Sequence, residues 1–247
     1  MNIVFINRSV VTSTNDEALS RIDSHQAHEG EMVCAFQQEN GRGQGGNRWE
    51  SEPGKNLLCS LILTPHHLVP ARQFLLTQMV SLGISKVIMG LVPNGSVAIK
   101  WPNDLYVNDK KVGGILFQNI IKGNILDYAV AGIGINLNQE DFGDELPNAA
   151  SLFQFANQQI PIEDFRQQMA HSINLYYKMT FSSSGVKQLE EEYLQKLYKI
   201  NEWKTYRTSE GDFTGKIEGV DEYGRLVIKR QTGSTEWYQF KEIEFVF

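Results

Sequence analysis

Residues 41–49 of this 247-residue chain, Gly-Arg-Gly-Gln-Gly-Gly-Asn-Arg-Trp, constrain its local fold more than any other segment. Four of the six residues from Gly41 to Gly46 are glycine. This disfavours a regular helix or strand, because each glycine inside one costs roughly 0.5–1 kcal/mol relative to alanine. Two arginines and a tryptophan accompany the glycines, so the backbone amides of this segment could surround an anion. A flexible surface loop would have the same composition, and segments further along the chain decide between the two interpretations.

Two further glycine-bearing segments are expected to be strands. In residues 132–138, Gly-Ile-Gly-Ile-Asn-Leu-Asn, the period of two in a strand places apolar side chains on one face and glycine and asparagine on the other. Residues 111–116, Lys-Val-Gly-Gly-Ile-Leu, are expected to pair with them in a hairpin. A bare glycine face weakens a strand unless another group approaches the backbone closely. The pair therefore predicts a floor for a flat ligand, with tight helix–sheet contacts as the alternative.

A third segment, Lys100-Trp101-Pro102-Asn103-Asp104, combines a cation, an aromatic ring, a rigid bend, an amide and a carboxylate. Proline fixes the backbone here, so the polar groups that follow it keep a constant direction. Lys111 is expected to return toward this bend across a turn at Asn108-Asp109. A lone lysine is usually solvated surface, but two lysines around such a bend are better explained by a phosphate group.

The chain as a whole predicts an α+β fold, with a mixed β-sheet and helices packed to one side of it. Strands are expected at residues 2–6, 31–36, 56–63, 97–100, 105–107, 112–121 and 125–137, and helices at 14–27, 71–89, 162–180 and 186–198. Residues 138–159 are expected to be a loop with one helical turn. After Trp203, short apolar stretches alternate with turn signals, which predicts a small SH3-like β-barrel. The predicted domains are residues 1–200 and 201–247.

Composition narrows the functional classes. The net charge of −6 argues against a nucleic-acid partner, which would require a basic surface. We expect no membrane span, because no apolar run approaches roughly 18 residues, and the first residues do not resemble a signal peptide. Cys34 and Cys59 lie in apolar surroundings that suit a reducing compartment. We therefore expect a cytoplasmic protein without membrane or nucleic-acid partners. The five histidines lack metal-ligand spacing.

Five segments, in fixed order, resemble those of biotin protein ligases. They are Ser13-Thr14-Asn15; Gln38 with Gly41-Arg42-Gly43 and Trp49-Glu50-Ser51; Lys100-Trp101-Pro102-Asn103-Asp104; residues 111–116; and residues 132–137. The resemblance covers nearly the whole chain and implies a catalytic core similar to that of class II aminoacyl-tRNA synthetases, followed by a small β module. It also implies an ATP-dependent enzyme that forms biotinyl-5'-AMP. Such an enzyme transfers biotin to a lysine of a biotin carboxyl carrier protein, with Mg²⁺ at the pyrophosphate.

The resemblance assigns roles to matching positions. The implied biotin site comprises Ser13, Thr14, Asn15, Gln38, Gly41, Arg42, Lys111 and Gly114. The implied ATP site comprises Arg42, Arg48, Trp49, Lys100, Asn103, Lys111 and Asn136. The implied catalytic residues are Lys111 and Arg42, which neutralise the negative charge of the carboxylate and phosphate, and Asp104, which lies near the incoming acceptor lysine. The metal ligands are not identified.

Several departures and alternatives remain. Gln44 and Asn47 stand where the family loop commonly carries arginines, which predicts weaker retention of the adenylate. No segment resembles the DNA-binding winged helix of the regulatory members, so we expect a ligase without repressor function.

A lipoate or octanoate ligase is one alternative, although Ser13-Thr14-Asn15 with Gln38 suits the ureido ring of biotin better. A non-catalytic biotin-binding sensor is another, and the presence of Lys111 and Asp104 argues against it. A homodimer formed through a strand of the sheet stays open.

Overall fold

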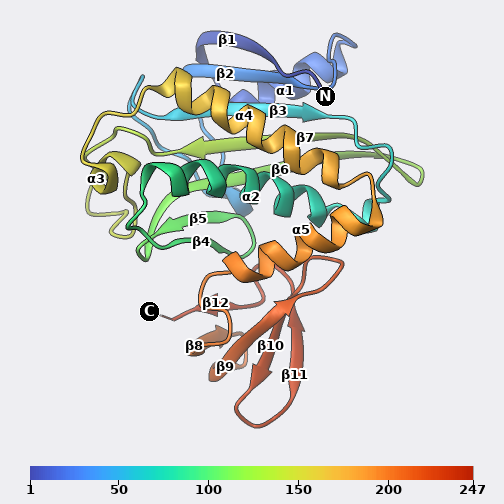
Figure 1. Ribbon diagram of the computed structural model, residues 1–247, viewed down its shortest axis with the longest axis vertical. Coiled ribbons are helices and arrows are strands. Elements are labelled where there is room, and N and C mark those ends of the chain that lie inside the picture. The colour runs from blue at the N-terminus through green and yellow to red at the C-terminus, as the bar shows by residue number, and fades with distance from the viewer. Residues whose placement is uncertain (247) are drawn as a thin grey trace.

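A computed structural model describes residues 1–246 and contains two sheets (Figure 1). The larger sheet has seven strands in the order β1-β2-β3-β7-β6-β5-β4. Its strands are β1 (Val4–Val11), β2 (Glu31–Gln38), β3 (Leu57–Leu63), β4 (Val97–Lys100), β5 (Asp104–Val107), β6 (Lys110–Lys122) and β7 (Ile125–Ile135). β1 is parallel to β2, and the other neighbouring strands are antiparallel. The predicted mixed sheet is therefore confirmed. β1 is longer than expected, because its polar residues lie on an edge strand.

Helices cover both faces of this sheet. α2 (Phe74–Leu91), α4 (Ile162–Met179) and α5 (Ser183–Lys196) lie on one face, and α1 (Thr14–Asp23) lies on the other (Figure 1). The short helix α3 (Leu152–Ala156) is the single helical turn expected between residues 138 and 159. The expectation that all helices lie to one side is wrong for α1, which packs on Val33, Ile62 and Val130. The apolar runs of β2 and β3 are typical of strands covered on both faces, and this signal for a second helical layer was overlooked in the expectation.

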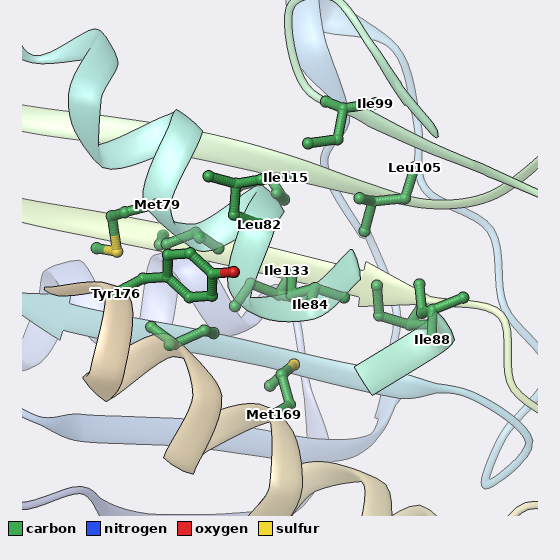
Figure 2. Packing of buried hydrophobic residues seen from close by; sticks show 14 of the residues in the cluster. Met79, Leu82, Ile84, Ile88, Ile99, Leu105, Ile115, Ile133, Met169 and Tyr176 are labelled. Atoms are coloured by element: carbon green, nitrogen blue, oxygen red, sulfur yellow. The ribbon is translucent and has the colours of Figure 1, made fainter. Parts of the chain in front are cut away.

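The main core lies between α2, α4 and the sheet. Figure 2 shows side chains of α2, among them Leu82 and Ile88, packed with Ile115 and Ile133 of β6 and β7 and with Met169 of α4. The stretch Pro70–Leu91 is long and apolar enough to cross a membrane, with a mean hydropathy of 1.6, contrary to the expectation from the sequence. Of its most apolar window, 67% is buried inside the protein, as in the core helix of a folded domain.

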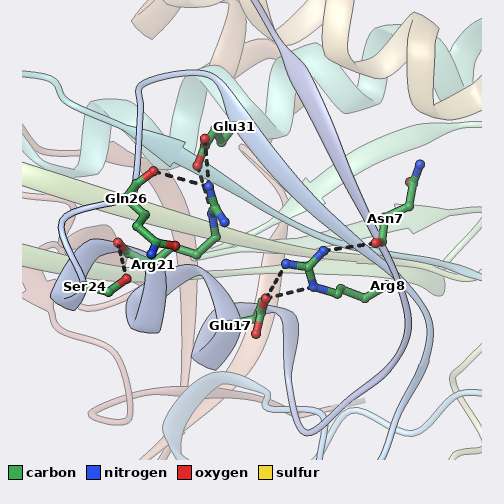
Figure 3. Close-up of polar contacts among 7 residues, drawn as sticks. All are labelled: Asn7, Arg8, Glu17, Arg21, Ser24, Gln26 and Glu31. Atoms are coloured by element: carbon green, nitrogen blue, oxygen red, sulfur yellow. Dashed lines mark hydrogen bonds and ion pairs between the residues drawn. The ribbon is translucent and has the colours of Figure 1, made fainter.

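α1 is held firmly on its face of the sheet. Its N-cap is Ser13, whose hydroxyl accepts a hydrogen bond from the Asn15 amide at 3.2 Å. Figure 3 shows two ion pairs that tie the helix to β1 and β2: Arg8 with Glu17 at 2.9 Å and Arg21 with Glu31 at 3.0 Å. The helix ends at Asp23 rather than at residue 27. These contacts fix the position of residues 13–15, the first implied segment of the site.

The smaller sheet lies below the larger sheet in Figure 1. Its strands are β8 (Trp203–Thr208), β9 (Gly211–Val220), β10 (Leu226–Arg230), β11 (Thr235–Tyr238) and β12 (Glu244–Phe245), all antiparallel, in the order β11-β10-β9-β8-β12. The Trp101 indole donates a 2.9 Å hydrogen bond to the Gly224 carbonyl between the two sheets. Closure into a barrel and the boundary at residue 200 stay predictions, and Phe247 lies outside the described residues.

Candidate active site

A cleft of about 370 Å³ lies on the α1 face of β6 and β7, at the junction with the C-terminal sheet. Most of the implied site residues line it: Ser13, Thr14, Asn15, Gln38, Arg42, Arg48, Trp49, Lys100, Asn103, Asp104, Lys111 and Gly114. Gly41 and Asn136 are not among the lining residues. All five segments of the resemblance therefore contribute residues to one cleft, the fifth through Gly132, Ile133 and Gly134.

One end of the cleft is a buried polar network at the N-terminus of α1. The Thr14 amide and hydroxyl both donate to Gln38 Oε1, at 2.7 and 3.1 Å. The Ser60 hydroxyl lies 2.8 Å from Thr14 Oγ1 and 2.6 Å from Asn15 Oδ1. The Asn15 Nδ2 donates to Gln118 Oε1 at 2.8 Å. Since Ser60, Thr14 and Asn15 are at most 4% exposed, the network holds these groups in fixed orientations.

Ser60 and Gln118 were not among the site residues expected from the sequence. Ser60 had one available signal, because it is a hydroxyl residue in the otherwise apolar strand Leu57–Leu63. Gln118 had none, because its contact with Asn15 joins residues 103 positions apart.

Ser60→Ala is expected to lower the free energy of unfolding by about 1–3 kcal/mol, because it removes a buried donor to Asn15 Oδ1. Denaturant unfolding measures the loss. Ser81→Ala is the matched control, since the Ser81 hydroxyl on α2 is equally buried and has no hydrogen-bond partner within residues 1–246. Equal effects in the two variants would contradict the importance of the network.

The glycines of β6 and β7 permit close approach of two side chains. A Cβ at Gly132 would lie 2.2 Å from Asn15 Oδ1, so Gly132 provides the tight helix–sheet contact that was the alternative interpretation. A Cβ at Gly134 would lie 2.5 Å from the Trp49 ring, and one at Gly114 would lie 3.6 Å from it. The flat group over Gly134 is thus the chain's own indole. Its Nε1 is buried without a hydrogen-bond partner among the described residues.

Residues 41–49 fold into a short hairpin, named here the lid hairpin. The Trp49 amide donates to the Gly41 carbonyl at 3.0 Å, and the Gly43 amide donates to the Asn47 carbonyl at 2.7 Å. The turn between them places Gly45 and Gly46 at φ of +69° and +94°, which favours glycine. At its base, Arg42 pairs with Asp16 of α1 at 2.8 Å. The segment therefore has a defined conformation beside the cleft.

The charged residues of the cleft favour an anion. Four cationic side chains line it, Arg42, Arg48, Lys100 and Lys111, against two carboxylates, Asp104 and Glu244. Lys111 Nζ lies 2.8 Å from Asp104 Oδ1, and both side chains are partly exposed. The Lys100 ammonium lies 4.9 Å from the centre of the Phe245 ring, and burial lowers the pKa of Lys100. The excess of cations can neutralise a phosphate or carboxylate group within a protein of net negative charge.

Two implied nucleotide residues make structural contacts. Asn103 Nδ2 donates to the Ile115 carbonyl at 2.5 Å, which holds the 101–104 bend against β6. Asn136 is 4% exposed, and its Nδ2 donates to the Ala150 carbonyl at 3.1 Å. Their contact with a nucleotide stays a prediction.

The chain matches two family models: the biotin/lipoate A/B protein ligase family over residues 8–136, and the biotin protein ligase C terminal domain over residues 205–246. The bifunctional ligase/repressor BirA of Bacillus spizizenii is 32% identical over 240 residues, which cover 94% of this chain and 71% of that protein. The chain belongs to the biotin protein ligase family. The biotin–[acetyl-CoA-carboxylase] ligase of Paracoccus denitrificans is 28% identical to this ligase, over 90% of this chain and 92% of that protein.

A solved structure supports the same assignment. The biotin protein ligase from Aquifex aeolicus, in complex with biotin and ATP, matches this ligase with a TM-score of 0.80 and 25% identity, over 98% of each chain. The resemblance inferred from the five segments is therefore confirmed.

The C-terminal module contributes residues to the site that were not expected from the sequence. Phe240, Ile243, Glu244 and Phe245 line the cleft together with the lid hairpin. No local pattern in these residues indicates this, because it depends on how the second sheet packs on the first.

Proposed function

We propose that this ligase joins biotin to ATP, forming biotinyl-5'-AMP and pyrophosphate. It then transfers the biotinyl group to a lysine of a biotin carboxyl carrier protein and releases AMP. The observation that carries the proposal is the Lys111–Asp104 pair, which lies in the same cation-lined cleft as the buried polar network of Thr14 and Gln38.

The polar network suits the ureido ring of biotin. That ring offers one carbonyl acceptor and two N–H donors, and the Ser13 and Thr14 hydroxyls and the Gln38 amide supply complementary groups. A lipoyl or octanoyl chain offers these polar groups neither an N–H donor nor a carbonyl acceptor, so it would displace their water without replacing its hydrogen bonds. The network therefore supports biotin as the acyl substrate.

Lys111 neutralises negative charge in the first step. The biotin carboxylate attacks the α-phosphorus of ATP, and each pair of like charges about 4 Å apart costs roughly 4 kcal/mol at an effective dielectric constant near 20. An ammonium group at the same distance offsets one such pair. The ion pair with Asp104 holds Lys111 in position before the anions bind. Mg²⁺ would be held mainly by phosphate oxygens, since residues 1–246 contain no cluster of three side chains suited to a metal.

Asp104 acts in the second step. The acceptor amine must be neutral to attack the acyl carbon, and a carboxylate beside it can accept its proton. Once a phosphate competes for the Lys111 ammonium, Asp104 becomes available for this role. The lid hairpin would exclude water from the mixed anhydride, which otherwise hydrolyses.

The proposal is tested by incubating the protein with ATP, biotin and an apo carrier domain and measuring the mass of each product. We expect AMP, pyrophosphate and a carrier heavier by one biotinyl group. A carrier whose acceptor lysine is replaced by arginine is the control. Transfer of octanoate or lipoate instead of biotin, or biotin binding without transfer, would contradict the proposal.

Gln44→Arg is expected to slow the escape of biotinyl-5'-AMP by roughly tenfold, because it adds a charge-assisted hydrogen bond from the lid hairpin to the phosphate. Gln44 lines the cleft and is neutral in this chain. A chase with unlabelled biotin measures the release rate. Gln195→Arg, on the exposed surface of α5, controls for the added charge. The same release rate in wild type and Gln44→Arg would count against a contact between the lid and the phosphate.

A further inference from the structure

The tip of the lid hairpin touches the C-terminal module. Lys241 Nζ donates a 2.9 Å hydrogen bond to the Gly45 carbonyl, although the two residues are 196 positions apart. A Cβ at Gly45 would lie 2.5 Å from Lys241 Cε and 3.0 Å from the Phe240 ring. The backbone of the hairpin tip is therefore packed directly on these two side chains.

The turn that carries Lys241 is itself held in an uncommon conformation. Lys241 has φ of +73°, a value that non-glycine residues rarely adopt. The Gln239 amide donates to Glu242 Oε2 at 2.6 Å, and the Glu242 amide donates back to the Gln239 carbonyl at 3.1 Å. These two bonds stabilise the turn that presents Lys241 to Gly45.

We propose that the hydrogen bond from Lys241 to the Gly45 carbonyl, named here the latch, holds the lid hairpin against the C-terminal module and thereby slows the escape of biotinyl-5'-AMP. This inference rests on the proposed function. The hairpin is then fixed at both ends, at its base by the Arg42–Asp16 ion pair and at its tip by Lys241. The hairpin lines the cleft, and so do Phe240 and residues 243–245 beside Lys241, so the contact between the two segments closes that part of the rim of the cleft. Lys241 is a positioning residue.

The latch explains how a lid with few cations can stay closed. Gln44 and Asn47 are neutral, so a bound phosphate attracts this hairpin less than it would an arginine-rich one. The Lys241 ammonium binds a backbone carbonyl of the hairpin, and this interaction does not depend on the charge of the ligand. Two kinds of interaction therefore retain the intermediate: the cations that line the cleft and the hydrogen bond between Lys241 and Gly45.

Hydrogen exchange of the ligand-free, full-length protein tests the latch. Lys241→Met keeps most of the length of the side chain and removes its charge, and Lys241→Arg keeps the charge. We expect Lys241→Met to raise amide exchange at Gly43 and Asn47 by roughly threefold to tenfold, and Lys241→Arg to restore protection. Lys229→Met is the control, since Lys229 on β10 forms a 3.9 Å ion pair with Glu218 and does not line the cleft.

Release of biotinyl-5'-AMP is then measured in the same variants. We expect Lys241→Met to release it roughly threefold to tenfold faster, with an unchanged midpoint of thermal unfolding. Unchanged exchange at Gly43 and Asn47 overturns the latch, whatever the activity. Faster exchange with unchanged release overturns its role in retention. A wild-type protein that forms no biotinyl-5'-AMP overturns the proposed function instead, while the exchange result still decides the contact.

Discussion

Lys111→Met is expected to form biotinyl-5'-AMP roughly a thousandfold more slowly than wild type while still binding biotin. The variant loses an ammonium group that offsets about 4 kcal/mol of repulsion between the two reacting anions, and each 1.36 kcal/mol of activation free energy changes the rate about tenfold. Its aliphatic chain is retained, and the polar network that would hold the ureido ring is untouched. Pyrophosphate release in a single turnover measures the rate, and calorimetry measures biotin affinity.

The adjacent lysine provides the control for this prediction. Lys110→Met removes the same charge from the same strand, but Lys110 Nζ is bound to the Pro147 carbonyl at 2.7 Å and does not line the cleft. We expect this variant to keep the wild-type rate. If Lys111→Met formed the adenylate at the wild-type rate, the assignment of Lys111 to charge neutralisation would be wrong.

Elements bounded by local signals were predictable from the sequence. The turn at Lys122-Gly123-Asn124 separates β6 from β7, and the bend at Trp101-Pro102-Asn103-Asp104 separates β4 from β5, close to the expected boundaries. The second layer formed by α1 had a signal, because the continuous apolar run around Val33 is typical of a strand covered on both faces. The run does not show which helix covers which face.

The site was predictable in part, for a related reason. Residues within the five implied segments converge because each segment lies at or beside the end or start of a strand, or at the start of a helix, along the same edge of the sheet. Ser60, Gln118 and the C-terminal segment belong to the site through contacts between residues far apart in sequence, which no local spacing encodes. The glycine pattern indicated close approach but could not name the group, which is Asn15 at Gly132 and Trp49 at Gly134.

Gly132→Ala is expected to weaken biotin binding by roughly a hundredfold, which corresponds to about 2.8 kcal/mol. The added Cβ would lie 2.2 Å from Asn15 Oδ1. Asn15 cannot move away freely, because it is bound to Ser60 and Gln118 and is 3% exposed. Overpacking of this kind typically costs 1–3 kcal/mol, and here it displaces the start of α1, where Ser13 and Thr14 line the cleft. Calorimetry with biotin measures the affinity, and circular dichroism confirms that the variant is folded.

Two further variants separate this clash from a general effect of replacing glycine. Gly90→Ala, on α2, would place its Cβ where no atom lies within 4 Å, and we expect unchanged biotin affinity and a gain in stability of about 0.5–1 kcal/mol. Asn15→Ala weakens the network by itself but removes the atom that the new Cβ would meet. If the clash is the cause, Gly132→Ala should reduce biotin affinity much less in the Asn15→Ala background than in the wild-type protein. If the two substitutions instead reduced the free energy of biotin binding additively, Gly132 would affect binding by another route. If Gly132→Ala alone bound biotin with wild-type affinity, the N-terminus of α1 would not be part of the biotin site.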